Sequence, residues 1–495
     1  MAMKVKSFGL VGIGMVAGFA MSLQFSALAQ KAGTLAPLPL SELRQLADVY
    51  GLIKTDYVEP VEDKKLLSEA ISGMVSSLDP HSVYLDKKAY REMKESMQGK
   101  FVGLGIEVAA EDGYVKIVTP IEDSPAFRAG IKAGDLITRI DNTPIKGLTL
   151  DEAIKMMRGE PKTKVVLTIA RRGDDKPWTV PLVREEIRVQ SVKAKMVEPG
   201  YAWLRISQFQ EQTIDDLVKK LQALYAQDPK LKGLVLDLRN DPGGLLPGAI
   251  GVSAAFLPAD KEVVSTVGQL PESNQSFYAR REFYANRGGD PLAKLPALFK
   301  SVPMVVLVNT GSASASEIVA GALQDYKRAV IMGSTTFGKG SVQTLRQLSP
   351  DTAVKLTTAR YYTPQGRSIQ AKGIVPDLAV DETLEGDGLN ALRVREADLQ
   401  KHLANGQDKE DVKARRDEAE EEQRLAALAR SRKPLEFGGK DDFQLAQALN
   451  HFKGLPVKLA KPETVLAKEE AAAPVSEPPA TSPTKPAEIP AAPKK

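Results

Sequence analysis

The sequence lacks cysteine altogether and contains only three histidines, His81, His402 and His451. Without cysteine the chain can form no disulfide, thiolate zinc site, cysteine nucleophile or thioether lipid anchor. With so few histidines it has no H-E-x-x-H metal motif, and none of the three lies in the region that reads as an α/β fold. A Ser-His-Asp triad is therefore disfavoured, and any catalytic base should be a lysine.

The sequence also has little excess charge of either sign. Its 67 basic and 63 acidic residues leave a formal charge of +4, so it has no positive block of the kind that binds nucleic acid. Of its residues 43% are hydrophobic, 26% charged and 6% aromatic, which is typical of a globular protein. At 495 residues the chain exceeds the size of one core, so we expect several folded units.

The N-terminus has the pattern of an export signal. Lys4 and Lys6 precede an apolar run over Phe8–Phe25, which ends at the small residues Ala27-Leu28-Ala29. We expect residues 1–29 to be a cleaved signal peptide or an uncleaved membrane anchor, and either would place the remainder in the periplasm. A buried helix of the first domain is the alternative, but it leaves the basic start unexplained.

Shifts in hydrophobic periodicity divide the rest of the chain. Helical spacing in 38–98 is broken at Asp79-Pro80-His81, and strand patterns dominate 99–186 around one helical stretch, Leu150–Arg158. We predict an α/β multi-domain protein with these parts: an N-terminal helical region (38–98), a separate β-rich domain (99–186), an α/β core built from crossovers in which an enzyme's site would be expected (187–384), a helical region (385–456) and a disordered tail (457–495).

Within 187–384 the predicted strands alternate with predicted helices, which favours a largely parallel sheet. The predicted strands are Gly233–Leu238, Val302–Asn309 and Ala329–Gly333, and the predicted helices are Ile214–Gln227 and Ala315–Asp325. Further on, Arg415–Arg432 carries mixed charges and few apolar residues, which fits either a solvated helix or a dimerisation helix. Ala471–Lys495 contains seven prolines, so we expect it to be disordered.

A serine-rich segment joins a predicted strand to a predicted helix. Ser314 follows small residues and directly precedes the helix, where unpaired backbone amides and the positive end of the helix dipole can stabilise an oxyanion. The same residue forms an S-x-x-E pattern with Glu317, which is the signature of a capping box with no catalytic role. The segment alone leaves both interpretations open.

A lysine between two glycines follows in the segment Thr335–Gln343. Gly338 and Gly340 let the backbone approach its neighbours closely and direct Lys339 into a confined space, where desolvation lowers its pKa so that the neutral amine can accept a proton. If the chain is extended from this point, Lys339 and Gln343 share one face, and the amide could orient the amine. The alternative is a lysine on a surface turn.

Three strings together resemble the C-terminal processing peptidases, or tail-specific proteases. They are Gly311–Leu323, Thr336-Phe337-Gly338-Lys339-Gly340 and Thr357-Thr358-Ala359-Arg360-Tyr361-Tyr362-Thr363-Pro364, and the likeness covers roughly residues 40–455. The resemblance implies a Ser–Lys dyad of Ser314 and Lys339, with Gln343 holding the lysine and Asp325 as a supporting acidic residue. It implies no metal or organic cofactor.

Once the dyad is assigned, the oxyanion hole should combine the Ala315 amide with one from Asp237–Gly244. A buried strand that ends in Pro-Gly-Gly lets bare N–H groups face a pocket, and we expect Gly243 first and Gly244 second.

In the β-rich region, Leu104, Gly105 and Ile106 are followed by Ala129-Gly130 and Gly134-Asp135. This order resembles that of PDZ domains. The G-L-G turn can offer amides to a terminal carboxylate, and the next strand can accept a peptide at its edge. We expect Leu104, Ile106, Ile154 and Met157 to line the pocket for the last side chain, and the resemblance implies that Arg158 senses bound peptide.

The sequence therefore predicts a periplasmic serine endopeptidase that selects protein substrates by their C-terminal tails. The resemblance also implies a lipoprotein adaptor and a homo-oligomer, and nucleic acid is not an expected partner. A catalytically inactive PDZ peptide-binding scaffold and an esterase-like acyl hydrolase are the alternatives.

Overall fold

The computed structural model describes residues 39–460, apart from 112, 175, 286–287, 385, 387–392 and 407–435. The chain divides into two compact units, Met1–Ile71 and Ser72–Lys495. The predicted signal segment (1–29), the charged stretch Arg415–Arg432 and most of the predicted tail lie outside the described residues.

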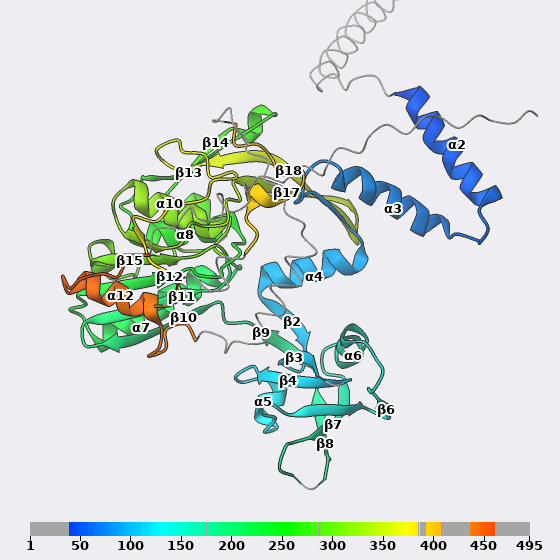
Figure 1. Cartoon of the computed structure of the whole chain (residues 1–495), viewed down its shortest axis with the longest axis horizontal. Coiled ribbons are helices and arrows are strands. Elements are labelled where there is room, and N and C mark those ends of the chain that lie inside the picture. The colour runs from blue at the N-terminus through cyan, green and yellow to red at the C-terminus, as the bar shows by residue number, and fades with distance from the viewer. Residues whose placement is uncertain are drawn as a thin grey trace, which may run out of the picture. The chain divides into compact units, whose positions relative to one another are not determined.

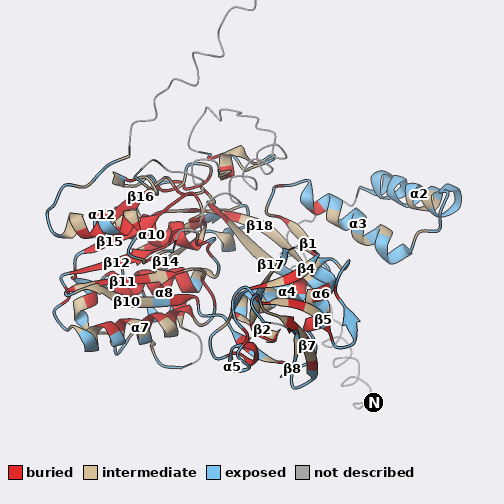
Figure 2. Cartoon of the chain, turned by 60° about the horizontal axis from the view of Figure 1, so that its bottom comes forward, coloured by how far each residue is buried: buried red, intermediate tan, exposed pale blue. Residues whose placement is uncertain are grey.

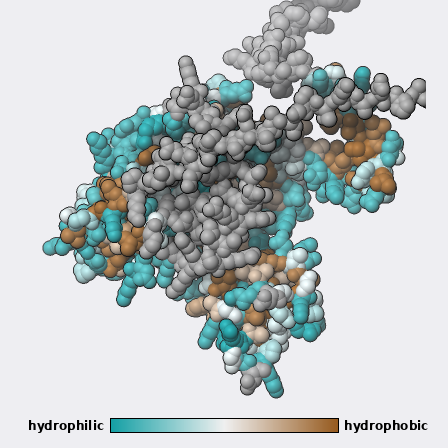
Figure 3. All heavy atoms as spheres, viewed as in Figure 1, coloured by the Kyte–Doolittle hydropathy of each residue, from teal (hydrophilic) through white to brown (hydrophobic). Residues whose placement is uncertain are grey.

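The first unit contains α2 (Leu40–Asp56) and the start of α3 (Asp63–Ser76). The predicted helical spacing produces these helices, but no residue of α2 is buried, and Leu43, Leu46 and Leu52 are exposed. Figure 3 shows apolar side chains over this part of the chain. No helix of the described residues is long and apolar enough to cross a membrane.

The second unit begins with the break at Asp79–Ser82 and a short strand, β1 (Val83–Leu85). Helix α4 (Lys87–Gln98) follows, with Asp86 as its N-cap and Gly99 in the left-handed conformation at its end. The sequence predicts helices in 38–98 with a break at Asp79-Pro80-His81 and no strand, so β1 is an unexpected element. This strand forms because it pairs with the strand Thr352–Tyr362, about 270 residues later in the chain.

The β-rich region is a small sheet domain with two short helices (Figure 1). Its strands pair in the order β3-β4-β5-β7-β8, and β6 pairs with β5. The elements are β3 (Ile106–Glu111), β4 (Tyr114–Pro120), α5 (Pro125–Arg128), β5 (Leu136–Ile140), β6 (Thr143–Pro144), α6 (Leu150–Met157), β7 (Lys164–Ala170) and β8 (Trp178–Val183).

A two-stranded ribbon carries the chain into and out of this domain. Strand β2 (Lys100–Gly103) enters, β9 (Glu185–Arg188) leaves, and the two pair antiparallel with Gly103 opposite Glu185. The domain is thus an insertion with adjacent ends.

The core of the second unit is a six-stranded sheet in the order β10-β11-β12-β15-β16-β19. Strands β11 to β19 are parallel, and β10 is antiparallel to β11. The elements are β10 (Val192–Glu198), β11 (Tyr201–Ile206), α7 (Thr213–Gln227), β12 (Gly233–Asp237), α8 (Leu246–Phe256), β15 (Met304–Val308), α10 (Ala315–Asp325), β16 (Val330–Gly333), β19 (Leu378–Ala379) and α12 (Phe443–Phe452).

Alternation along the strands divides the core between the two faces of this sheet. Leu236 and Val306 face the large cluster that contains α7, α8 and α10, whereas Val235 and Val305 face α12. Figure 2 shows the central strands and α10 almost wholly buried. Burial on both faces explains why these strands are continuous apolar runs in the sequence.

A second sheet has the order β1-β18-β13-β14, with β17 also paired to β18. Its strands are β13 (Glu262–Gly268), β14 (Gln275–Tyr278), β17 (Ser341–Ser349) and β18 (Thr352–Tyr362). Short helical turns complete the described structure: η1 (Pro271–Ser273), α9 (Arg281–Tyr284), η2 (Ala297–Lys300) and η4 (Glu396–Asp398). The predicted α/β multi-domain class is confirmed, although the sequence did not predict this sheet.

Candidate active site

Three neighbouring parallel strands end at one edge of the core sheet. The turn 240–244 follows β12, the segment 309–314 follows β15, and the segment 334–340 follows β16. Because parallel strands place their carboxyl ends together, the fold gathers the predicted oxyanion turn, Ser314 and Lys339 at this edge.

Ser314 has a strained backbone at the start of α10. Its φ is 57° and its ψ is −113°, a conformation that L-residues rarely adopt. The side chain is half-buried, whereas the neighbouring hydroxyls of Ser312 and Ser316 are buried and donate to the carbonyls of Leu238 and Asp241. Of the three serines, Ser314 is the one presented at the turn.

Lys339 is held where water is scarce. Burial lowers its pKa from the ordinary value and the nearby Lys355 lowers it further, while Glu396, Glu317 and Asp79 act in the opposite direction. The flanking glycines are required sterically: Gly338 has a φ of +99°, and a Cβ on Gly340 would lie 2.3 Å from the Gln370 backbone nitrogen. The amine therefore gives up its proton at a lower pH than a free lysine does.

Glu317 connects the Ser314 segment to the Lys339 segment. One carboxylate oxygen accepts the Ser314 and Lys339 N–H groups at 2.7 and 2.9 Å, and the other accepts the Gly338 N–H and the Thr336 hydroxyl at 2.7 and 2.5 Å. Burial raises the pKa of Glu317 to about 7, and these hydrogen bonds oppose that rise. The S-x-x-E pattern is thus more than a helix cap, because the same carboxylate fixes both loops.

Tyr361 of β18 is a further residue that the sequence did not reveal. It is buried, and its hydroxyl interacts with the Ser314 side chain and donates to the Lys339 carbonyl. Burial raises the pKa of this hydroxyl well above its ordinary range, so the hydroxyl stays protonated and able to donate. Only its place in the string that carries the family resemblance hinted at a role.

The side chains of Gln343 and Asp325 form hydrogen bonds with residues other than Lys339. The pairing of β17 with β18 shifts register between Val342 and Gln343, with Thr358 as the extra residue on β18. Gln343 Nε2 instead donates to Ser341 Oγ at 3.0 Å and to Thr357 Oγ1 at 3.3 Å. Asp325 ends α10 and binds Arg367 and the Gln365 N–H.

The expected oxyanion residues lie against the serine. A Cβ built on Gly243 would be 2.8 Å from both the Ala315 nitrogen and Ser314 Cβ, so Gly243 lies beside Ser314. The Gly243 N–H itself donates to Asp241 Oδ1 at 2.9 Å. Gly244, at φ +146°, lies against the Phe209 carbonyl.

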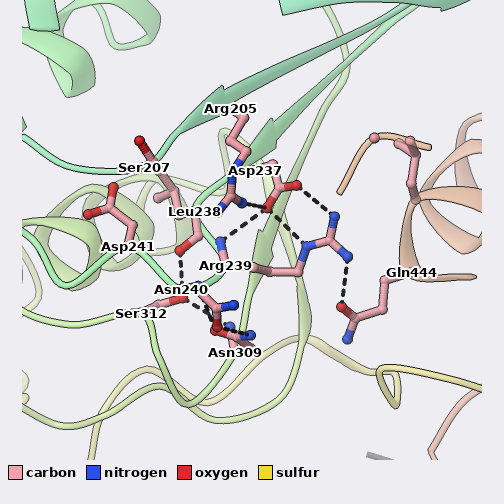
Figure 4. A network of polar contacts seen from close by, with 12 residues as sticks. Arg205, Ser207, Asp237, Leu238, Arg239, Asn240, Asp241, Asn309, Ser312 and Gln444 are labelled. Atoms are coloured by element: carbon pink, nitrogen blue, oxygen red, sulfur yellow. Dashed lines mark hydrogen bonds and ion pairs between the residues drawn. The ribbon is translucent and has the colours of Figure 1, made fainter. Parts of the chain in front are cut away.

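The end of β12 that leads to this turn is fixed by a buried charge cluster, drawn in Figure 4. Arg239 is fully buried between Asp237 and Asp442, with an Nη2–Oδ2 distance of 2.6 Å to each. Gln444 of α12 accepts another guanidinium N–H at 3.1 Å. Because every charge in the cluster is paired, α12 and its cap anchor the strand that leads to the predicted oxyanion turn.

The predicted peptide-binding residues lie together in the small domain. Leu104, Ile106, Ile154 and Met157 belong to one apolar cluster. Gly105 has a φ of +75°, and a Cβ there would lie 2.1 Å from Ser124 Cβ, so this turn requires glycine. Arg158 ends α6 and pairs with Glu95 at 3.3 Å. Among the described residues no cluster of acidic or histidine side chains is suited to a metal ion.

Comparison with known proteins identifies the family. The chain is 47% identical over 345 residues to the carboxy-terminal-processing protease of Bartonella bacilliformis, covering 69% of this chain and 76% of that one. The profile of peptidase family S41 matches residues 200–380. The chain belongs to peptidase family S41.

Other parts of this S41 peptidase match as well. A PDZ domain profile matches residues 116–171, and a profile described as the activating protease CtpB N-terminal domain matches 19–89. A CtpA-like serine protease of Staphylococcus aureus is 38% identical over 354 residues, covering 71% of this chain and 67% of that one. The solved photosystem II D1 C-terminal processing protease is 30% identical with a TM-score of 0.39, covering 68% of this chain and 85% of that one. The predicted family, the PDZ domain and the serine-type peptidase class are confirmed.

Proposed function

We propose that Ser314 is the nucleophile and Lys339 the general base of an endopeptidase that recognises its substrates by their C-termini. The observation that carries this proposal is the Glu317 carboxylate, which accepts backbone N–H groups from both the Ser314 and the Lys339 segments. A buried group that ties these two segments together gives a hydroxyl and a desolvated amine a shared, fixed frame.

The reaction is acyl transfer. The lone pair of neutral Lys339 takes the Ser314 Oγ proton while Oγ bonds to the scissile carbonyl carbon, and the carbonyl oxygen becomes an anion. When that anion collapses, the C–N bond breaks and the ammonium returns its proton to the leaving amine. Water then attacks the ester, Lys339 takes one of its protons, and the C–Oγ bond breaks as that proton returns to Oγ.

The Ala315 N–H is the first donor to the tetrahedral anion. It belongs to the first residue of α10, and among the described residues it donates to no protein acceptor. The second donor in the proposal is Gly243, whose N–H must leave Asp241 Oδ1 to serve the anion. The structure thus corresponds to a resting arrangement of the turn, which substrate completes.

Substrate selection is assigned to the PDZ domain. The Leu104–Ile106 turn would receive the terminal carboxylate, and Ile106 and Ile154, which are only partly buried, would contact the last side chain. Peptides that end in an apolar residue with a free carboxylate should be cleaved well, and their C-terminal amides poorly.

The proposed location is the periplasm, supported by the basic and apolar N-terminal segment. A lipoprotein adaptor and a homo-oligomer complete the proposal. Cell fractionation of a tagged chain tests the location, since recovery in the cytoplasm would refute it. Light scattering of the purified chain tests the oligomer, and co-purification with lipoproteins tests the adaptor.

Cleavage of an unfolded protein with an apolar C-terminus tests the chemistry. Ser314→Ala and Lys339→Ala should each abolish cleavage, while the exposed controls Ser301→Ala and Lys294→Ala should behave as wild type. A wild-type chain that binds such tails without cutting them would be the scaffold. Cleavage of small esters with no dependence on a free C-terminus would indicate the esterase.

A further inference from the structure

The tetrapeptide Asp79–Ser82 lies next to the strands that carry the proposed catalytic residues. It precedes β1, which pairs with β18 so that Val83 lies opposite Lys355. In the sequence it is distinctive only as a helix break. In the structure each of its polar side chains contacts a part of the chain more than 270 residues away.

Asp79 is the centre of this contact. Its Oδ1 accepts the His81 and Ser82 N–H groups at 2.8 and 2.9 Å and the Thr357 hydroxyl at 3.1 Å, and its Oδ2 accepts the Ser82 hydroxyl at 2.6 Å. Burial opposes ionisation, but these hydrogen bonds outweigh it and hold the pKa of Asp79 below its usual value. Asp79 is therefore a charged acceptor within hydrogen-bonding distance of β18.

The Thr357 hydroxyl passes this arrangement on to Gln343. A hydroxyl has one proton, and when that proton points to Asp79 the oxygen can only accept from its other neighbour. That neighbour is Gln343 Nε2, at 3.3 Å, which also donates to Ser341 Oγ at 3.0 Å. The NH₂ end of the amide is thereby fixed. Among the described residues no protein donor is bonded to the carbonyl oxygen of the Gln343 side chain.

We propose that Asp79 is a positioning residue, which acts through the Thr357 hydroxyl to fix the polarity of the Gln343 amide and so leaves the side-chain carbonyl oxygen free to accept a hydrogen bond from the Lys339 amine when that amine approaches it. This inference rests on the proposed Ser314–Lys339 mechanism. A flipped amide would present its NH₂ group to the lysine, and that group cannot accept from an ammonium.

A second line of contacts from the same tetrapeptide supports the role. His81 Nε2 lies 2.7 Å from Glu396 Oε2, Gln370 donates to Glu396 Oε1 at 2.8 Å, and the Gly340 N–H donates to Gln370 Oε1 at 3.0 Å. This line ends at the backbone directly after Lys339. The tetrapeptide thus braces both ends of the segment 340–343.

The charged groups around the amine set the expected pH behaviour. Lys355 of β18 disfavours the ammonium, and Glu396 of η4, Glu317 of α10 and Asp79 favour it. Removing the Asp79 charge while keeping its acceptor should let Lys339 lose its proton at lower pH. The ascending limb of the pH–rate profile, on which the rate rises as Lys339 loses its proton, should then move to lower pH.

The full-length protein is tested as a set of matched variants. Thr357→Val removes the relay hydroxyl and should lower kcat about tenfold or more with little change in KM, because a misplaced base weakens the transition state. Thr357→Ser keeps the hydroxyl and should restore most of kcat. Asp79→Asn, which keeps an oxygen acceptor, should move the ascending limb of the pH–rate profile to lower pH.

Melting temperatures separate this role from simple stabilisation. The proposal is supported if Thr357→Val and Thr357→Ser melt alike but differ in kcat. It is overturned if the two variants have the same kcat, if kcat falls only in step with melting temperature, or if Asp79→Asn leaves the limb unmoved. Ser314→Ala and Lys339→Ala, measured alongside, show independently whether the underlying mechanism fails.

Discussion

Glu317→Gln is the most informative single substitution because it changes charge and hydrogen bonding while nearly preserving shape. In the wild type one oxygen accepts two backbone N–H groups and the other accepts one N–H and the Thr336 hydroxyl. An amide can keep only one acceptor oxygen. Its NH₂ group should turn toward Thr336, whose hydroxyl can reverse and accept, so the Gly338 N–H loses its partner.

The expected loss of folding stability distinguishes Glu317→Gln from Glu317→Ala. One unsatisfied buried donor costs about 1–3 kcal/mol, so Glu317→Gln should fold and melt a few degrees lower. Glu317→Ala leaves the N–H groups of Ser314, Gly338 and Lys339 without this acceptor, about 3–9 kcal/mol in all. That loss is comparable with a typical total stability of about 5–15 kcal/mol. The alanine variant should therefore be largely unfolded or heat-labile.

Activity should fall further than stability. Loosening the frame between Ser314 and Lys339 should lower the kcat of Glu317→Gln by about 10- to 100-fold. Because the Glu317 charge favours the lysine ammonium, its removal should move the pH–rate limb to lower pH. Peptide cleavage from pH 5 to 10, with melting curves and Glu272→Gln as an exposed control, measures both effects. A fully active Glu317→Gln with an unmoved limb would refute the bridging role.

Three further predictions concern the same edge of the sheet. Gly243→Ala should cut kcat at least 100-fold, because its Cβ would fill the space 2.8 Å from the Ala315 nitrogen and φ is +94°; wild-type kcat would exclude an anion site there. Burial raises the pKa of Asp241 to about 8, so folding favours its protonated form, and the stability that this form contributes is lost as pH rises from about 4 to 8. The melting temperature of Asp241→Asn should therefore fall less than that of the wild type between pH 5 and 8. Equal falls in melting temperature would contradict this prediction. Because burial is the main cause that lowers the pKa of Lys339, the wild-type rate should rise on an apparent pKa below that of free lysine, and a limb at the free-lysine position would exclude it as the base.

The parts of the fold set by local pattern were predictable from sequence. Gly233–Asp237 and Met304–Val308 are buried on both faces, so they are short apolar runs, and α10 begins and ends where the sequence indicates. The sequence also brings Ser314 and Lys339 to one edge, since both follow parallel strands. These features depend on residues close together in the chain.

The parts that depend on distant residues were not predictable. Glu317 satisfies a helix-cap pattern, and only the packed loops show that it also binds the lysine segment. The register shift at Gln343 leaves no trace in the alternation of side chains. Arg239 donates to an acceptor 203 positions away, and Asp79 accepts from a donor 278 positions away. No periodicity in a single sequence encodes such pairs.

The ribbon of β2 and β9 has an architectural consequence. Gly103 and Glu185 face each other across a ladder, so the whole PDZ module begins and ends at nearly one point. A tight connection between those two residues would close the scaffold without breaking a strand of the core sheet. The proposed substrate selection and the proposed chemistry therefore lie in separable modules, so the PDZ domain could be exchanged for another without disturbing the core sheet.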